Sequence, residues 1–456
     1  MRRKNDLGRD PIGPLVLKIA LPSMLAQFVS VLYSIVDRMY IGHIPQVGDL
    51  ALAGVGVCGP VVTMIGSAAS LIGVGGAPLM SMRMGEGEEE QARRILANCF
   101  LMLCVLSAAL MALLAPIREP MLMLFGASEA TFPFAGAYFS VYLCGTPFAL
   151  LATGMCQFII CQGFAAQAML SVVLGAVTNI LLDPVFIYGL EMGVTGAAVA
   201  TVISQIGSCA FVLAFLFGRR PPVRITFSGY DFRVMRRVLL IGFTPFVIIA
   251  VDNVMIIAMN AVLKRYGGAA QGDMLLTCAT IAQSFMLVVT MPLGGISGST
   301  QTILSFNYGA RRPDRVWETQ KRVFALCVAY TGVMTLIAWT CGGLFARLFT
   351  NDGGIAGQAV RAIRVCSLAL LPLGIQYEIV DGFTALGQVR YSLPLSFWRK
   401  LVYFAALFAL PAAFGARAAF FAEPVSDVLG PAVSIAVYIL VIRRILERRG
   451  CGPEGA

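Results

Sequence analysis

Long apolar segments separated by short polar breaks constrain this 456-residue chain more than any other feature. A helix that spans a bilayer needs about 20 predominantly apolar residues, and segments of that kind recur along the whole sequence. Breaks at glycine, proline and charge clusters leave six apolar segments in each half. We therefore predict twelve transmembrane helices, at residues 14–41, 50–80, 95–115, 132–161, 166–188, 194–217, 238–263, 274–303, 323–344, 359–386, 393–414 and 418–442.

The composition also indicates a membrane protein. Hydrophobic residues make up 58% of the chain and charged residues 13%, and the mean hydropathy is +0.82, outside the soluble range. The net charge of +10 does not indicate nucleic-acid binding, because most Lys and Arg gather in the two tails and in alternate loops or their flanks. This asymmetry follows the positive-inside rule. We predict an integral plasma (inner) membrane protein with lipid around it, both termini cytoplasmic, and no nucleic-acid partner.

The two halves repeat each other. Three residues of the first half recur in the second half at one constant spacing, as the pairs Gly85 and Gly309, Phe125 and Phe349, and Gly163 and Gly387. Because each half has an even number of spans, both halves enter the membrane from the same side, which defines a parallel repeat. We predict an all-α membrane protein of two six-helix lobes, residues 1–217 and 238–456, related by a parallel pseudo-two-fold axis. Residues 218–237 form a basic cytoplasmic linker between them.

Acidic residues inside the spans are the first candidates for function. A charged side chain at mid-bilayer costs about 2.5–3.5 kcal/mol on insertion scales, so such residues rarely occur without a role. Asp37 lies late in the first span beside Arg38, and these two could form an interfacial pair. Tyr33 lies four residues before Asp37, however, and shares its helical face. Both interpretations stay open on the residues alone.

Asp183 lies in the fifth span and has Asn179 four residues earlier on the same face. Pro184 follows directly, and proline disfavours helical geometry at the residue before it. Asp183 is therefore either a functional carboxylate or a carboxylate at a helix end broken by proline.

In the second half, Glu378 and Asp381 are three residues apart and so lie side by side on one helix. Two neighbouring carboxylates in lipid would not both stay ionised, which indicates a shared proton or a bound cation. Asp252 precedes Asn253 in the seventh span. It is either a further candidate or a polar contact between helices.

Several classes of chemistry are excluded by the sequence. It contains no GxxxxGK[ST] motif, so ATP is not the energy source on this chain. The twelve cysteines form no CxxC pair, and His43 is the only histidine, which excludes multi-histidine metal chemistry. The dispersed acids supply no nucleophile and base constellation. We predict a protein that is not an enzyme and has no cofactor.

At this point the sequence resembles a known family. The segments ALPSMLAQFVSVLYSIVDRMYIGH, MSMRMGEGEEEQARR, NILLDPVFIYGLEMGVTGAAVATVISQ and YEIVDGFTALGQVR together look like multidrug and toxic compound extrusion (MATE) transporters. The Asn-x-x-x-Asp-Pro segment and the GVTGAAVATVISQ that follows it are the most specific part. The resemblance implies two six-helix lobes that face each other as a V, with alternating access driven by sodium ions or protons.

The resemblance also implies ion sites. Family members with an amino-lobe cation site form it from a Tyr and an Asp of helix one, an Asn and an Asp of helix five, and a Thr of helix six. The matching positions are Tyr33, Asp37, Asn179, Asp183 and Thr201; a sodium ion would bind the last four. Another branch uses a carboxyl-lobe site with acids on helices seven and ten. Asp381 matches the helix-ten position, but the helix-seven position falls near Asn253, one residue from Asp252.

We therefore expect a secondary active multidrug exporter. It would exchange small organic compounds for protons or sodium ions by alternating access and would work as a monomer. The predominance of acidic charge inside the spans favours cationic substrates. The alternative is a flippase for a lipid-linked saccharide from the same superfamily, which would be expected to place more Arg in its central cavity.

Overall fold

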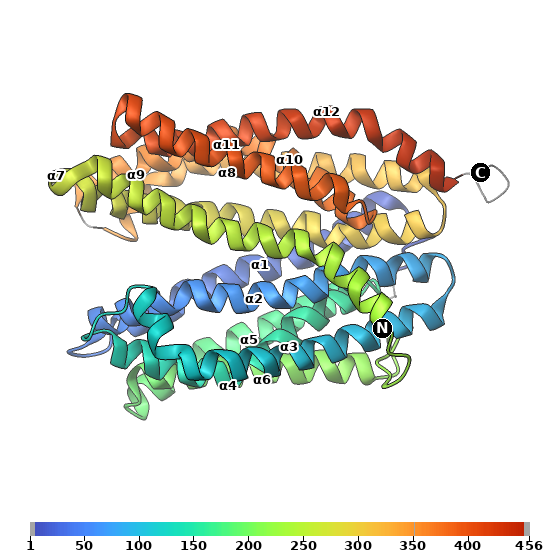
Figure 1. Cartoon of the computed structure of the whole chain (residues 1–456), viewed down its shortest axis with the longest axis horizontal. Helices are drawn as coiled ribbons and strands as arrows, with labels where there is room; N and C mark the ends of the chain where they lie inside the picture. Colours follow the sequence, from blue (N-terminus) through green and yellow to red (C-terminus); the bar gives the residue numbers. More distant parts are fainter. Residues whose placement is uncertain (1–4, 351, 451–456) are drawn as a thin grey trace. The chain divides into compact units, whose positions relative to one another are not determined.

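The computed structural model describes residues 5–350 and 352–450 and is built from helices (Figure 1). Within this part of the chain, twelve helical segments are long and apolar enough to cross a membrane, which confirms the predicted number. The ends of the chain, residues 1–4 and 451–456, lie outside the described residues, so the predicted placement of both termini in the cytoplasm stays a prediction.

Contacts divide the chain into two compact units. The first consists of residues 5–7 and Leu21–Ile249, and the second consists of Gly8–Ala20 and residues 250–450. Within the second unit, Arg312 Nη1 donates to the Gly8 carbonyl at 2.6 Å and Arg315 Nη2 donates to the Asp10 carbonyl at 2.8 Å. These bonds attach the segment before the first helix to the second unit.

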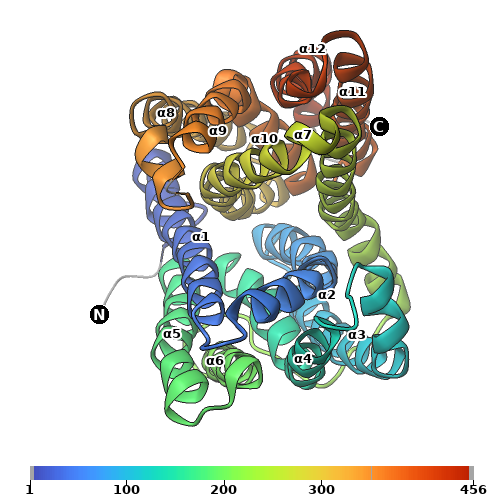
Figure 2. The ribbon, with the colours of Figure 1, turned by 90° about the vertical axis from the view of Figure 1, so that its left-hand side faces the viewer.

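The first unit is a bundle in which α4 packs against α2, α3 and α6 (Figure 2). Its helices are α1 (Ile12–Gly42), whose first residues up to Ala20 belong to the second unit, α2 (Gly48–Gly85), α3 (Glu89–Leu124), α4 (Phe132–Ile160), α5 (Ala165–Pro184), the π-helical turn η1 (Val185–Gly189) and α6 (Gly193–Phe217).

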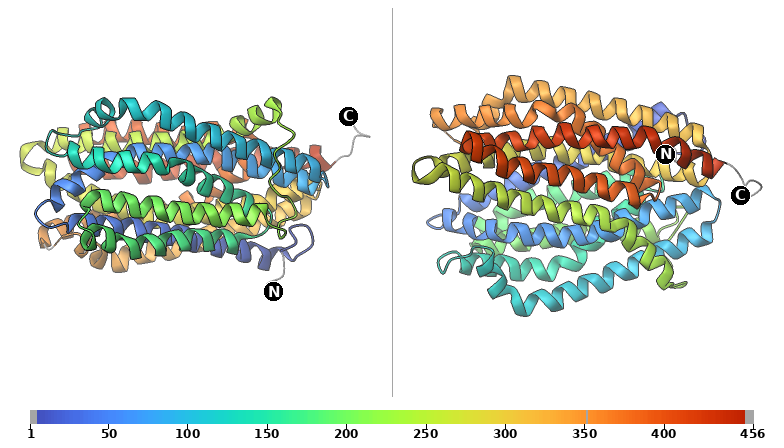
Figure 3. Two further views of the ribbon diagram at one scale, coloured as in Figure 1. Left: turned by 90° about the horizontal axis from the view of Figure 1, so that it is seen from below. Right: turned by 45° about the horizontal axis from the view of Figure 1, so that its top comes forward.

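The helices of the second unit lie roughly along one common axis, and the chain reverses direction between successive spans (Figure 3). They are α7 (Phe232–Gly309), α8 (Pro313–Arg347), α9 (Gly353–Cys366), the 3₁₀ turn η2 (Ser367–Ala369), α10 (Leu370–Ala385), α11 (Val389–Phe414), η3 (Ala416–Phe421) and α12 (Ala422–Gly450). Gly268, with φ of 59°, interrupts α7 and separates two spans. The first of these spans begins in the first unit.

The internal repeat appears in the turns of each unit. Gly163 follows α4 with φ of 87°, and its partner Gly387 follows α10 with φ of 69°. Both lie in the left-handed region, which glycine adopts without a steric penalty and which commonly ends a helix. The residue pairs noted in the sequence therefore mark equivalent helix ends.

The helices are longer than the apolar segments that predict them. The third segment was expected at 95–115, whereas α3 runs from Glu89 to Leu124, because polar residues continue the helix beyond the apolar centre that hydropathy detects. The tenth segment, expected as one helix at 359–386, is divided into α9, η2 and α10. Pro372 causes the break, since proline lacks an N–H group and clashes with the carbonyl four residues earlier.

The segment between α6 and α7 is held against the first unit. Val223 N donates to Gln162 Oε1 at 2.9 Å. Asn98 on α3, fully buried, donates from Nδ2 to the Gly229 carbonyl at 3.1 Å and accepts from Asp231 N at 3.0 Å. The predicted linker, residues 218–237, is thus an ordered strap, that is, a segment whose backbone is hydrogen-bonded by the side chains of Gln162 and Asn98.

Loss of the Asn98 anchor should expose this strap to protease. An Asn98→Ala variant removes the hydrogen bonds to Gly229 and Asp231, which contribute about 0.5–1.5 kcal/mol each, and raises the open population on the order of tenfold. Limited trypsin digestion should cut the variant faster after Arg219 or Arg224, whereas Arg220 precedes Pro221 and is not a trypsin site. Gln91→Ala, on the exposed face of the same helix, is the matched control. Equal cleavage of both variants would contradict the anchoring role.

Candidate cation site in the first unit

The structure places the predicted amino-lobe residues on three helices of the first unit. Tyr33 and Asp37 lie on α1, Asn179 and Asp183 on α5, and Thr201 on α6. Four of them are buried: Asn179 and Asp183 have no exposed surface, Thr201 is 4% exposed and Asp37 is 8% exposed. They are therefore held away from solvent inside the unit.

Direct contacts join these side chains. Asn179 Nδ2 donates to Asp183 Oδ1 at 3.2 Å and to Thr201 Oγ1 at 3.3 Å. The carboxyl groups of Asp37 and Asp183 contact each other. Tyr33 lies near enough to interact electrostatically with both acids. The five residues thus form one group, which we call the α1–α5–α6 cluster.

The α1–α5–α6 cluster contains more acceptors than donors. Asp37 Oδ1, Asn179 Oδ1 and Asp183 Oδ2 are buried without a hydrogen-bond partner. Buried polar atoms in proteins are almost always paired, and an unpaired one needs an explanation. Because all three atoms are oxygens and two belong to carboxyl groups, any group that pairs with them has to be electropositive.

The local sequence explains how the end of α5 positions the Asp183 carboxylate in the α1–α5–α6 cluster. Pro184 adopts helical angles, with φ of −63° and ψ of −30°, so the helix is not broken there. The chain instead widens into the π-helical turn η1, a feature frequent at functional sites. Tyr188 on this turn donates from its hydroxyl to the Tyr40 carbonyl at 2.7 Å. This bond ties the end of α5 to the end of α1 and so holds Asp183 beside Asp37.

Sequence reasoning missed three polar neighbours of the cluster. Tyr138 on α4 interacts with Thr201 and stacks on Tyr142, with ring centroids 6.3 Å apart. Gln205 lies one turn after Thr201 on α6, and its Oε1 is buried without a partner. The i, i+4 spacing of both pairs was a usable signal. What the sequence did not show is that α4 and α6 pack together.

The secondary candidates Asp252, Glu378 and Asp381 all belong to the second unit. Asp381 on α10 is held by Ser297 and Gln301. Glu378, one turn earlier, is fully buried, and neither of its carboxyl oxygens has a partner. Asp252 on α7 forms an ion pair with Lys400 of α11.

Four charged residues inside the second unit were not recognised from the sequence. Arg399 and Lys400 fall within the predicted span 393–414, and the structure places them near the middle of α11. Arg399 Nη1 is 2.7 Å from Asp427 Oδ1 on α12, and Glu423 lies one turn before Asp427. The position of both cations within the apolar segment 393–414 was a signal for them.

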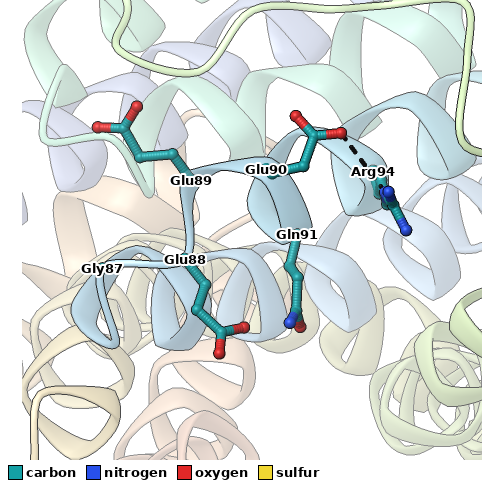
Figure 4. A pocket seen from close by; sticks show the side chains of 6 residues that line it. All are labelled: Gly87, Glu88, Glu89, Glu90, Gln91 and Arg94. Atoms are coloured by element: carbon teal, nitrogen blue, oxygen red, sulfur yellow. Dashed lines mark ion pairs between the residues drawn. The ribbon is translucent and has the colours of Figure 1, made fainter.

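A shallow surface depression lies at the turn between α2 and α3 (Figure 4). Its lining residues are mostly exposed and charged, and Arg94 Nε is 3.5 Å from Glu90 Oε1. Since α2 runs back from the end of α1, this turn is at the opposite end of the bundle from Asp37. The depression contributes nothing to the α1–α5–α6 cluster.

The described part of the chain has twelve helices capable of crossing a membrane, and its first unit contains a buried acidic cluster, a combination typical of an integral membrane transporter. The family model MatE matches residues 22–185 and 249–409. The chain therefore belongs to the MATE family, as its sequence resemblance predicted.

Individual relatives cover nearly the whole chain. The multidrug export protein MepA of Staphylococcus saprophyticus is 24% identical over 442 residues, 95% of each chain. The FAD transporter of Shewanella oneidensis is 26% identical and covers 98% of each chain. A solved outward-facing multidrug resistance MATE family transporter of the MOP superfamily superposes with a TM-score of 0.91 at 21% identity, over 98% of this chain and 100% of that one. These comparisons confirm the fold and do not favour the flippase alternative.

Proposed function

We propose that this transporter is a multidrug exporter that exchanges organic cations for protons or sodium ions. The coupling ion binds in the α1–α5–α6 cluster. The observation that carries the proposal is the set of three buried, unpartnered oxygens, on Asp37, Asn179 and Asp183. A single proton or sodium ion supplies the positive charge that these oxygens lack.

The oxygen atoms of the α1–α5–α6 cluster can bind either a sodium ion or a proton. Sodium would take oxygen ligands from Asp37, Asn179, Asp183 and the Thr201 hydroxyl, which all belong to the cluster. A proton would lie between the two contacting carboxyl groups. In both cases a positive charge compensates two acids whose burial in a low-dielectric interior costs several kcal/mol per ion.

Coupling requires only that ion and substrate favour different conformations. The ion holds α1 and α5 together through Asp37 and Asp183, and its release leaves two repelling acids in contact. Substrate binding favours the second state. We expect the two predicted lobes to alternate in access in this way, in a monomer of the plasma membrane with both termini in the cytoplasm.

Two observations support organic cations as the substrate class: the names of the relatives and the pairing of the basic residues inside the second unit. The MepA proteins are named for multidrug export. The FAD transporter is named for a ligand that carries phosphates, and phosphates would need available cationic groups. Arg399 and Lys400 are engaged with Asp427 and Asp252, so we favour organic cations.

Proteoliposomes with separately imposed gradients test the proposal. Purified protein is reconstituted, and efflux of ethidium is followed under a pH gradient alone, a sodium gradient alone, or neither. We expect export under one of the two gradients and none after an ionophore collapses it, with empty liposomes as the control. Equal ethidium movement with and without both gradients would overturn ion coupling.

A further inference from the structure

A second ionic cluster lies in the second unit, and the proposed coupling does not use it. Asp252 of α7, Arg399 and Lys400 of α11, and Glu423 and Asp427 of α12 compose it, and we call it the α7–α11–α12 cluster. All five residues belong to helices that are capable of crossing the membrane. Charged groups at this depth are costly and mark functional sites by default.

Within this cluster, Lys400 and Asp252 form an ion pair with unequal exposure. The side chain of Lys400 is 4% exposed, whereas that of Asp252 is 46% exposed. A half-exposed carboxylate near the middle of a span cannot face hydrocarbon without a large penalty, so it faces a water-accessible space. The acid is therefore reachable by a solute, and the lysine lies behind it.

Lys400 has a second acceptor within the cluster. Asp427 is fully buried, and only its Oδ1 is occupied, by Arg399 Nη1 at 2.7 Å. Its Oδ2 is buried without a partner. Lys400 already interacts electrostatically with Asp427 and Glu423. Because the ammonium group of lysine is carried on a flexible four-carbon stem, it can move from one carboxylate to another nearby.

A purely structural ion pair would explain why Lys400 and Asp252 lie together. It would not explain why Asp427 Oδ2 is buried without a partner beside them. Breaking a buried pair is strongly destabilising when it leaves one charge unpaired. Here neither charge is left unpaired, because the solute cation pairs with Asp252 and the Lys400 ammonium group pairs with Asp427. The total charge of the cluster increases only by that of the bound cation.

We propose that the α7–α11–α12 cluster binds the positively charged group of an organic cation at Asp252, and that Lys400 is a tethered cation that occupies Asp252 when the site is empty. On binding, the Lys400 ammonium group moves to Asp427. This inference takes its ligand class from the proposed function, but it does not involve the coupling ion. Because the tethered cation competes with the solute, it lowers the apparent affinity.

Equilibrium binding of tetraphenylphosphonium to the purified full chain, without any ion gradient, tests the exchange. Lys400→Gln removes the competitor and should tighten binding on the order of tenfold. Asp252→Asn should weaken it by a similar factor. The double variant should bind like Asp252→Asn, since the lysine acts only through this acid.

Two controls separate this role from a general charge effect. Lys18→Gln removes an exposed lysine from the part of α1 that belongs to the second unit and should leave affinity unchanged. Lys400→Arg keeps a tethered cation and should stay near the wild-type affinity. If Lys400→Gln does not fold, Asp252→Asn and Lys400→Arg still decide the outcome.

Three results would overturn the inference. Unchanged or weaker binding by folded Lys400→Gln removes the competitor role, and unchanged binding by Asp252→Asn removes the site. Either result leaves the proposed function standing if the wild type still exports cations. A wild-type protein that neither binds nor exports organic cations overturns the substrate class and this site together.

Discussion

Replacing Asp37 or Asp183 by asparagine should abolish ion-driven export while the protein remains folded. Each substitution removes one of the two neighbouring carboxyl groups, so the ion can no longer hold α1 and α5 together and its release no longer leaves two acids that repel each other. With one proton exchanged per monovalent cation, a pH unit corresponds to about 1.4 kcal/mol and roughly tenfold accumulation. We expect that accumulation in wild-type proteoliposomes and none in either variant.

Stability separates this loss from misfolding. Asparagine has nearly the shape of aspartate, and its introduction removes the repulsion between two buried acids, so the thermal midpoint in detergent should not fall. Asp314→Asn, at an exposed position in the first turn of α8, is the matched control and should export like the wild type. Gradient-driven accumulation in Asp37→Asn or Asp183→Asn would remove that residue from the coupling mechanism.

Hydropathy predicted the number of spans because the length of an apolar run is set by the thickness of the bilayer. It did not predict where the helices end. The first turns of α3 and α8 carry charged residues such as Glu89 and Asp314, which suit a helix N-terminus but lie outside the apolar window. The break between α9 and α10 depends on Pro372, whose effect a hydropathy average does not register.

The α1–α5–α6 cluster was predictable because its members lie on helical faces at fixed spacing, as Asn179 and Asp183 do, and because the family resemblance supplied their grouping. The α7–α11–α12 cluster could not be predicted from the sequence in this way. Lys400 and Asp252 are far apart in sequence, and no local spacing joins them. Arg399 and Lys400 do fall within the predicted span 393–414, but near its start, where adjacent basic residues are common, so only the helix bounds placed them near the middle of α11.

The crossing of α2 and α7 inside the first unit depends on two glycines. A Cβ atom on Gly242 would overlap the carbonyl oxygen of Leu71 and lie 2.6 Å from its carbonyl carbon. A Cβ atom on Gly75 would lie 2.8 Å from Gly242 N. In both cases the obstacle is main chain, which cannot rotate away as a side chain can. The two helices therefore approach closely because neither glycine carries a side chain.

Gly242→Ala should consequently destabilise the first unit. Overpacking costs about 1–3 kcal/mol when side chains can adjust, and occasionally more, so a clash with backbone should reach the upper end. We expect the thermal midpoint in detergent to fall by roughly 5–10 °C and the yield of folded protein to drop. Gly207→Ala on α6 is the matched control, because a Cβ there meets no atom within 4 Å. It should be neutral or stabilising by about 0.5–1 kcal/mol, and equal midpoints for the two variants would show that α2 and α7 cross less closely.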